Sequence, residues 1–71
     1  MSTNKITIEL NGEPFAVDYG TSVQELIDQL ELRTGRIAVA LNRAVVPKAE
    51  YSSVSLKQND KVEIVNFVGG G

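Results

Sequence analysis

Residues 5–10, KITIEL, carry an apolar side chain at every second position. This two-residue period is typical of a β-strand with one buried face. An Asn11-Gly12 pair and a second alternating run, residues 13–19, follow directly. Asn-Gly predicts the tight type I′ turn of a hairpin, because both of its central residues need a positive φ angle. A two-residue turn then fixes the facing pairs as Leu10 with Glu13, Ile8 with Phe15 and Ile6 with Val17.

A helix is predicted after this hairpin. Ser22 and Glu25 have the S-x-x-E spacing of a capping box, with Thr21 as a competing cap. The apolar residues that follow recur with the helical period and lie on one face. They are Val23, Leu26, Ile27 and Leu30. We expect the helix to end near Thr34-Gly35, because glycine suits the left-handed position that closes many helices.

The second half of the chain predicts more sheet. Residues 36–42, RIAVALN, alternate again, and a short strand at residues 45–46 stops at Pro47, which suits a sheet edge. Residues 48–59 have no clear period, but they contribute three expected core side chains. These are Tyr51, Val54 and Leu56. Residues 61–68 form the last predicted strand.

The order of these elements predicts an α+β fold with one helix packed on one face of a sheet. If the last strand lies parallel to the first and beside the third, the result is a mixed sheet of four to five strands, because parallel neighbours need a crossover. This arrangement is the β-grasp, or ubiquitin-like, fold. We expect residues 1–68 to form this single domain and residues 69–71 to form a flexible C-terminal glycine tail.

The last strand also predicts an apolar surface away from the helix. If Val62 and Ile64 face the helix, the alternate residues of that strand face outward. The apolar side chains expected on the outer face are Ala38, Ala40, Val65 and Phe67. Such an exposed group is typical of a surface that binds a partner. The alternative, equally favoured by the sequence, is that Phe67 folds over the sheet edge and is covered.

Charge and composition exclude several classes of protein. The net charge is −2, and the seven basic residues among the 71 are scattered, so neither nucleic acid nor an anionic membrane is an expected partner. The first residues lack the apolar stretch of a signal peptide, and no run reaches membrane-spanning length. We therefore expect a cytoplasmic protein that is a monomer when free.

The chain has no histidine and no cysteine, which excludes imidazole bases, thiol nucleophiles and His/Cys zinc sites. The acids Glu25, Asp28 and Glu31 fit a solvated helix face. We expect no enzyme activity, no metal and no bound cofactor. What remains is the C-terminal Gly69-Gly70-Gly71, whose carboxylate is the most distinctive reactive group. Terminal glycines are usually disordered, but these follow an apolar strand without a polar spacer.

The chain resembles the ThiS family of sulfur carrier proteins, which have a ubiquitin-like fold and end in Gly-Gly. The matching segments are LNGE (10–13), TSVQELI (21–27), AVALN (38–42), VVPK (45–48), the Asn59-Asp60 turn and VEIVNFVGGG (62–71). Together they cover nearly the whole chain. Asn59 departs from the family, which more often has glycine there, but both residues tolerate the left-handed conformation.

The resemblance implies how the tail is used. A ThiF-like adenylating enzyme activates the Gly71 carboxylate with ATP, a persulfide donor supplies sulfur, and thiazole synthase takes that sulfur from the Gly71 thiocarboxylate. Gly70 would provide a slim penultimate position and Gly69 additional reach. Val65, Phe67 and Val68 are the candidates for docking, together with Ala38 and Ala40.

Three alternatives remain at this point. The small subunit of molybdopterin synthase shares the fold, tail and chemistry, although its chain is usually longer. A ubiquitin-like protein modifier would be joined through Gly71 to lysines of its targets. The third alternative is a β-grasp binding module whose glycines are only a frayed end.

Overall fold

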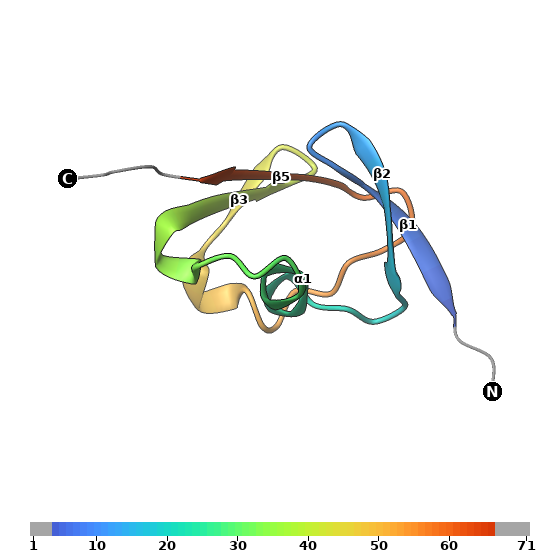
Figure 1. The fold of residues 1–71 in the computed structure, drawn as a ribbon, viewed down its shortest axis with the longest axis horizontal. Helices are drawn as coiled ribbons and strands as arrows, with labels where there is room; N and C mark the ends of the chain where they lie inside the picture. Colours follow the sequence, from blue (N-terminus) through green and yellow to red (C-terminus); the bar gives the residue numbers. More distant parts are fainter. Residues whose placement is uncertain (1–3, 67–71) are drawn as a thin grey trace.

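Five strands form one mixed sheet in the order β2-β1-β5-β3-β4, in a computed structural model that describes residues 4–66 (Figure 1). The strands are β1 (Lys5–Leu10), β2 (Glu13–Asp18), β3 (Ile37–Leu41), β4 (Ala44–Val46) and β5 (Lys61–Asn66). β5 runs parallel to β1 and antiparallel to β3. The helix α1 (Val23–Gln29) lies on one face of the sheet (Figure 1). The predicted β-grasp fold is therefore confirmed, with five strands.

The first hairpin has the register that its turn predicts. Asn11 and Gly12 have φ angles of 50° and 87°, so both central residues of the turn are left-handed. Leu10 pairs with Glu13, and two positions further from the turn Ile8 pairs with Phe15, as predicted. The two-residue turn and the alternation of the strands thus favour the same pairing. A slip of one residue would turn the apolar side chains of one strand toward solvent.

The helix begins where the capping box predicts and ends earlier than expected. The Glu25 N–H donates to the Ser22 hydroxyl oxygen (3.0 Å), and the Ser22 N–H donates to the Glu25 carboxylate (2.9 Å). α1 ends at Gln29, and the left-handed residue after it is Glu31, with a φ of 61°. The prediction that Gly35 closes the helix is wrong, because that residue lies in a separate 3₁₀ turn, Thr34–Arg36.

Two backbone hydrogen bonds close the helix at this early position. The Leu32 N–H donates to the Ile27 carbonyl (3.2 Å) and the Glu31 N–H to the Asp28 carbonyl (3.0 Å). These are the two bonds of a Schellman motif with Glu31 in the place that glycine usually takes. At about 100° per residue, a longer helix would carry Leu32 about 180° away from Val23, on the solvent side. Ending the helix lets Leu32 pack against the core instead.

The core lies between the sheet and α1. Its helix residues are Val23, Leu26 and Ile27, each fully buried. The sheet contributes Ile6, Ile8, Val17, Ile37, Val39, Val46 and Val62. The segment between β4 and β5 closes the remaining side with Tyr51 and Leu56, as the sequence predicts, while Val54 is half-buried against them. A 3₁₀ turn, Lys48–Glu50, begins that segment.

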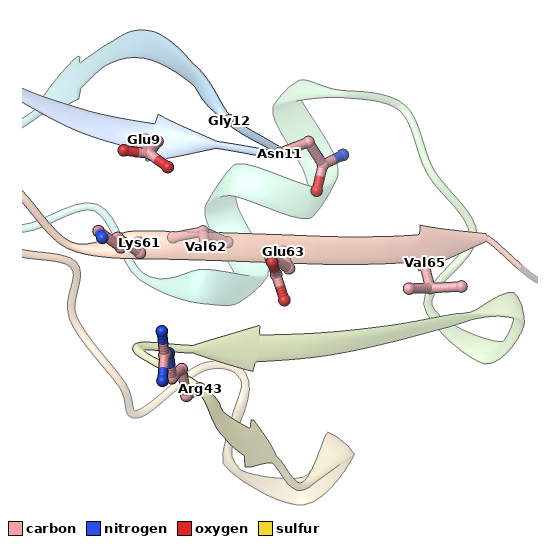
Figure 2. Close-up of a pocket in the computed structure, with 8 residues that line it drawn as sticks. All are labelled: Glu9, Asn11, Gly12, Arg43, Lys61, Val62, Glu63 and Val65. Carbon is pink, nitrogen blue, oxygen red and sulfur yellow. The ribbon is translucent and has the colours of Figure 1, made fainter.

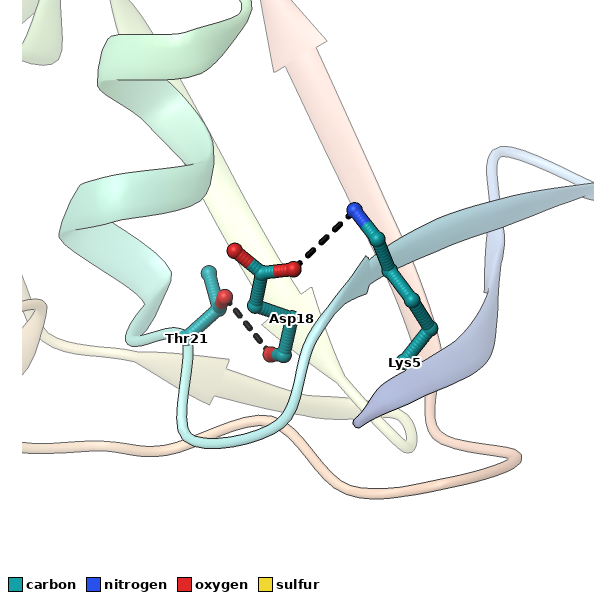
Figure 3. Close-up of polar contacts among 3 residues, drawn as sticks. All are labelled: Lys5, Asp18 and Thr21. Carbon is teal, nitrogen blue, oxygen red and sulfur yellow. Dashed lines mark hydrogen bonds and ion pairs between the residues drawn. The ribbon is translucent and has the colours of Figure 1, made fainter. Parts of the chain in front are cut away.

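The connection from β2 to α1 is a short turn held by polar contacts (Figure 3). The Thr21 hydroxyl donates to the Asp18 carbonyl oxygen (2.7 Å), and the Lys5 ammonium lies 3.0 Å from the Asp18 carboxylate. Gly20 has a φ of +90°, a value that L side chains rarely adopt. Since both side chains of the ion pair are more than half exposed, water screens it and its contribution to stability is small.

Candidate functional site

β5 divides its side chains between the core and the surface. Val62 is 1% exposed, whereas Val65, three positions along the same strand, is 57% exposed. Lys61 and Glu63 are also exposed, and Ile64 is half-buried against the core. The predicted division of this strand is therefore confirmed over the described residues. Its outward residues lie on the face of the sheet opposite α1.

Small side chains flank the exposed part of β5. In β3, Ala38 pairs with Val65 and Ala40 pairs with Glu63. Ala40 also pairs with Val45 of β4, which is 76% exposed. Alternation along paired strands puts these side chains on the same face of the sheet. We call the group the outer patch: Ala38, Ala40, Val45 and Val65.

Val45 was not predicted as part of this surface, although the sequence held the signal. Asn42 and Arg43 have φ angles of 51° and 74°, so they form a two-residue turn like that of the first hairpin. Such a turn places Leu41 opposite Ala44, and Val45 must then face Ala40. The Asn-Arg pair is a weaker turn signal than Asn-Gly, because arginine has no special tolerance for positive φ.

Several predicted site residues lie outside the part of the chain that the structure describes. Phe67, Val68 and the tail Gly69–Gly71 are in this group. Their roles in docking and in sulfur transfer stay predictions. Within residues 4–66, the structure brings Ala38 and Val65 together as direct cross-strand neighbours, with Ala40 two positions further along β3.

A shallow hollow of about 610 Å³ lies beside the outer patch (Figure 2). Its lining residues are Glu9, Asn11, Gly12, Arg43, Lys61, Val62, Glu63 and Val65. All of them except Val62 are exposed, so the hollow is an open depression and not an enclosed pocket. Two carboxylates and two cations surround it.

The start of β5 is held in place by an asparagine from the second turn. The Lys61 N–H donates to the Asn42 side-chain oxygen (2.9 Å), and the Asn42 amide donates to the Asp60 carboxylate (3.1 Å). The other carboxylate oxygen of Asp60 accepts from the Lys57 N–H (2.7 Å). Through these bonds Asp60 serves the backbone at a turn, in which Asn59 has a φ of 71°.

Residues 4–66 contain no group of three or more His, Cys, Asp or Glu side chains placed to hold a metal ion. No helix in this range is long and apolar enough to cross a membrane.

Two known proteins are similar to this chain over most of its length. The sulfur carrier protein ThiS of Bacillus subtilis is 36% identical over 66 residues, covering 90% of this chain and 98% of that protein. A thiazole synthase from Magnetococcus marinus is 41% identical over 64 residues, which make up 90% of this chain and 20% of that longer protein.

A solved structure and a family model agree with these relatives. The crystal structure of the thiamine biosynthesis protein ThiS from Geobacter metallireducens matches with a TM-score of 0.80 at 30% identity, covering 93% of this chain and all of that one. The family model described as the ThiS family matches residues 4–71. Because this match spans the fold and continues through the final glycines, the chain belongs to the ThiS family.

Proposed function

We propose that this chain carries sulfur for thiamine biosynthesis, with the sulfur held as a thiocarboxylate at the carboxyl end of Gly71. The observation that supports the proposal most directly is the order of features along the last part of the chain. The outward side of β5, which ends at Asn66, is followed by a Gly69-Gly70-Gly71 tail within the family match. In this role the protein is a co-substrate of other enzymes and not an enzyme.

The proposed chemistry begins by making the carboxylate reactive. An oxygen of the Gly71 carboxylate attacks the α-phosphorus of ATP, pyrophosphate leaves, and an acyl-adenylate forms. The terminal sulfur of a persulfide donor attacks the carbonyl carbon of this mixed anhydride, and AMP leaves. A thiol then cleaves the sulfur–sulfur bond to release the thiocarboxylate. Since the chain has no cysteine, it cannot hold sulfur as a persulfide of its own.

The glycines suit a tail that enters another protein's active site. Three extended residues span roughly 10 Å, at about 3.3–3.6 Å each. Glycine has no side chain beyond hydrogen, so Gly70 and Gly69 could pass through a narrow channel and adopt φ angles closed to other residues. We assign sulfur carriage to Gly71 and reach to the two preceding glycines.

The outer patch supplies a docking surface next to that tail. Val65 and Val45 expose apolar area on this face, and the small side chains of Ala38 and Ala40 pair with strand β5 beside them. Exposed apolar side chains gain stability when a partner covers them. We propose that Phe67 and Val68 continue this surface toward the tail.

Three partners follow from the proposal: a ThiF-like adenylating enzyme, a persulfide sulfur donor and thiazole synthase. The synthase is supported by the relative from Magnetococcus marinus, in which a segment like this chain occurs in a protein named thiazole synthase. A carrier that acts on such an enzyme gains from a high local concentration, which a shared chain provides.

The test uses the absence of cysteine. The purified chain is incubated with ATP, a ThiF-like enzyme and a persulfide donor, then treated with a thiol alkylator and analysed by intact mass and C-terminal fragmentation. We expect one ATP-dependent adduct that maps to Gly71. A variant lacking Gly70 and Gly71 is the control and should give none.

Other outcomes would support other functions. Adducts on lysines of other proteins, stable to boiling in detergent, would identify a protein modifier. Sulfur transfer to the large subunit of molybdopterin synthase, but not to thiazole synthase, would place the carrier in the other pathway. An unchanged Gly71 carboxylate, in a mixture that converts a known carrier, would contradict the proposal.

A further inference from the structure

β5 extends beyond the strand that lies parallel to it. The register pairs Glu9 with Lys61 and Leu10 with Val62. The last backbone bond between the two strands runs from the Asn11 N–H to the Val62 carbonyl (2.9 Å), and the chain then turns away at Asn11-Gly12. β5 continues to Asn66. The C-terminal end of β5 is therefore paired with β3 on one side and has no β1 residue paired with it on the other.

The side chain of Asn11 takes the place of the missing strand. The Ile64 N–H donates to the Asn11 side-chain oxygen (2.9 Å), and the Asn11 amide nitrogen donates to the Ile64 carbonyl (3.4 Å). Figure 2 shows the Asn11 amide beside the stretch of β5 between Glu63 and Val65. A primary amide offers one acceptor and one donor group, as a peptide unit does, so it can serve as one more rung of the ladder.

We infer that Asn11 is a positioning residue for activation of the tail, an inference that rests on the proposed function. Its rung is adjacent to Val65 of the outer patch, at the end of β5 from which the chain leads to Gly71. Without the rung, the strand end is held on the β3 side only, and it samples more conformations. The apparent affinity for a partner falls in proportion to the fraction of molecules in the binding-competent conformation.

Asn42 provides a matched control within the same chain. It occupies the first position of the second two-residue turn, with a φ of 51° against 50° for Asn11. Its side-chain oxygen also accepts a β5 backbone N–H at 2.9 Å, but from Lys61 at the start of the strand. Replacing either asparagine by glycine removes the side-chain bonds and keeps positive φ accessible. The two variants therefore differ mainly in which end of β5 loses its support.

The experiment measures ATP-dependent adenylation by a ThiF-like enzyme as a function of carrier concentration. For Asn11→Gly we expect KM to rise about threefold to tenfold while kcat changes less than about twofold, because docking selects the ordered conformation. Asn42→Gly should leave KM unchanged. Asn11→Asp keeps the oxygen that accepts the Ile64 N–H, so it should restore part of the affinity.

Hydrogen exchange of the Ile64 amide provides a second readout that does not depend on the enzyme. Exchange should be faster in Asn11→Gly and close to wild type in Asn42→Gly. Equal KM changes in the two glycine variants would overturn the inference, as would an unchanged KM in Asn11→Gly beside an active wild type. A wild-type chain that is not adenylated at all would instead overturn the proposed function, and this inference with it.

Discussion

The two faces of the sheet carry similar apolar residues, but one face is buried and the other is exposed. Val62 and Val65 belong to one strand, yet the first is 1% exposed and the second 57%. The inner face is covered by α1 and by Tyr51 and Leu56 of the segment after β4. The described residues place no such layer over the outer face, where Val65 and Val45 meet solvent.

This difference reflects what a chain of 71 residues can cover. A small domain buries only about 60% of the surface that its unfolded chain exposes, so one helix and one connecting segment suffice for one face. The inner residues therefore stabilise the fold, while the outer ones are free to contact a partner. Substitutions on the two faces should separate stability from function.

The largest expected effect is on the inner face. Leu26 is fully buried in the centre of α1, so Leu26→Ala should lower the free energy of unfolding by about 2–5 kcal/mol, through lost burial and a residual cavity. In a domain of this size each kcal/mol lowers the melting temperature by about 4–8 °C. Thermal and urea unfolding measure the change. A loss below about 1 kcal/mol would mean that the inner face is not the main source of stability.

The sharpest comparison uses one substitution at two places on β5. Val62→Ala should cost about 2 kcal/mol of unfolding free energy, because it empties a buried site. Val65→Ala should stay within about 0.5 kcal/mol, because that side chain is mostly exposed. The KM for adenylation should differ in the opposite sense. It should rise for Val65→Ala and stay at the wild-type value for Val62→Ala at temperatures where that variant is folded. Equal stability losses at both sites would remove the distinction between the faces.

The smallest expected effect concerns a polar contact on the outer face. Lys5→Ala removes the 3.0 Å ion pair with Asp18. Both side chains are about 60% exposed, so the loss should be at most about 1 kcal/mol and should shrink further in high salt. Urea unfolding at two salt concentrations measures it. A larger loss that is independent of salt would point to a structural role that the solvated contact does not explain.

Local signals in the sequence were sufficient for the turns and the helix start. Asn11-Gly12 fixed the hairpin register because few residues accept positive φ at both positions of a type I′ turn. Ser22 and Glu25 fixed the start of α1 because their side chains satisfy helix-end N–H groups that have no backbone partner. Each of these arguments needs only residues that are close in the chain.

The helix end was beyond such signals. The sequence favoured Gly35 as the closing residue, but Glu31 takes the left-handed position because Leu32 gains burial when the helix stops early. Val45 was missed for a different reason, because the Asn42-Arg43 turn that pairs it with Ala40 is a weaker local signal than Asn-Gly. At the helix end, packing between elements therefore outweighed a local preference.

By itself, the sequence determined the order of strands and helix, the hairpin register and the glycine tail, because alternation, turn chemistry and capping act over a few residues. Only the tertiary structure decided how the C-terminal end of β5 is held. Asn11 and Ile64 are 53 positions apart, and their side-chain-to-backbone bonds exist only after β5 has paired beside β1. The physical reason is that a long-range contact forms after both elements have been placed, so no short stretch of sequence specifies it.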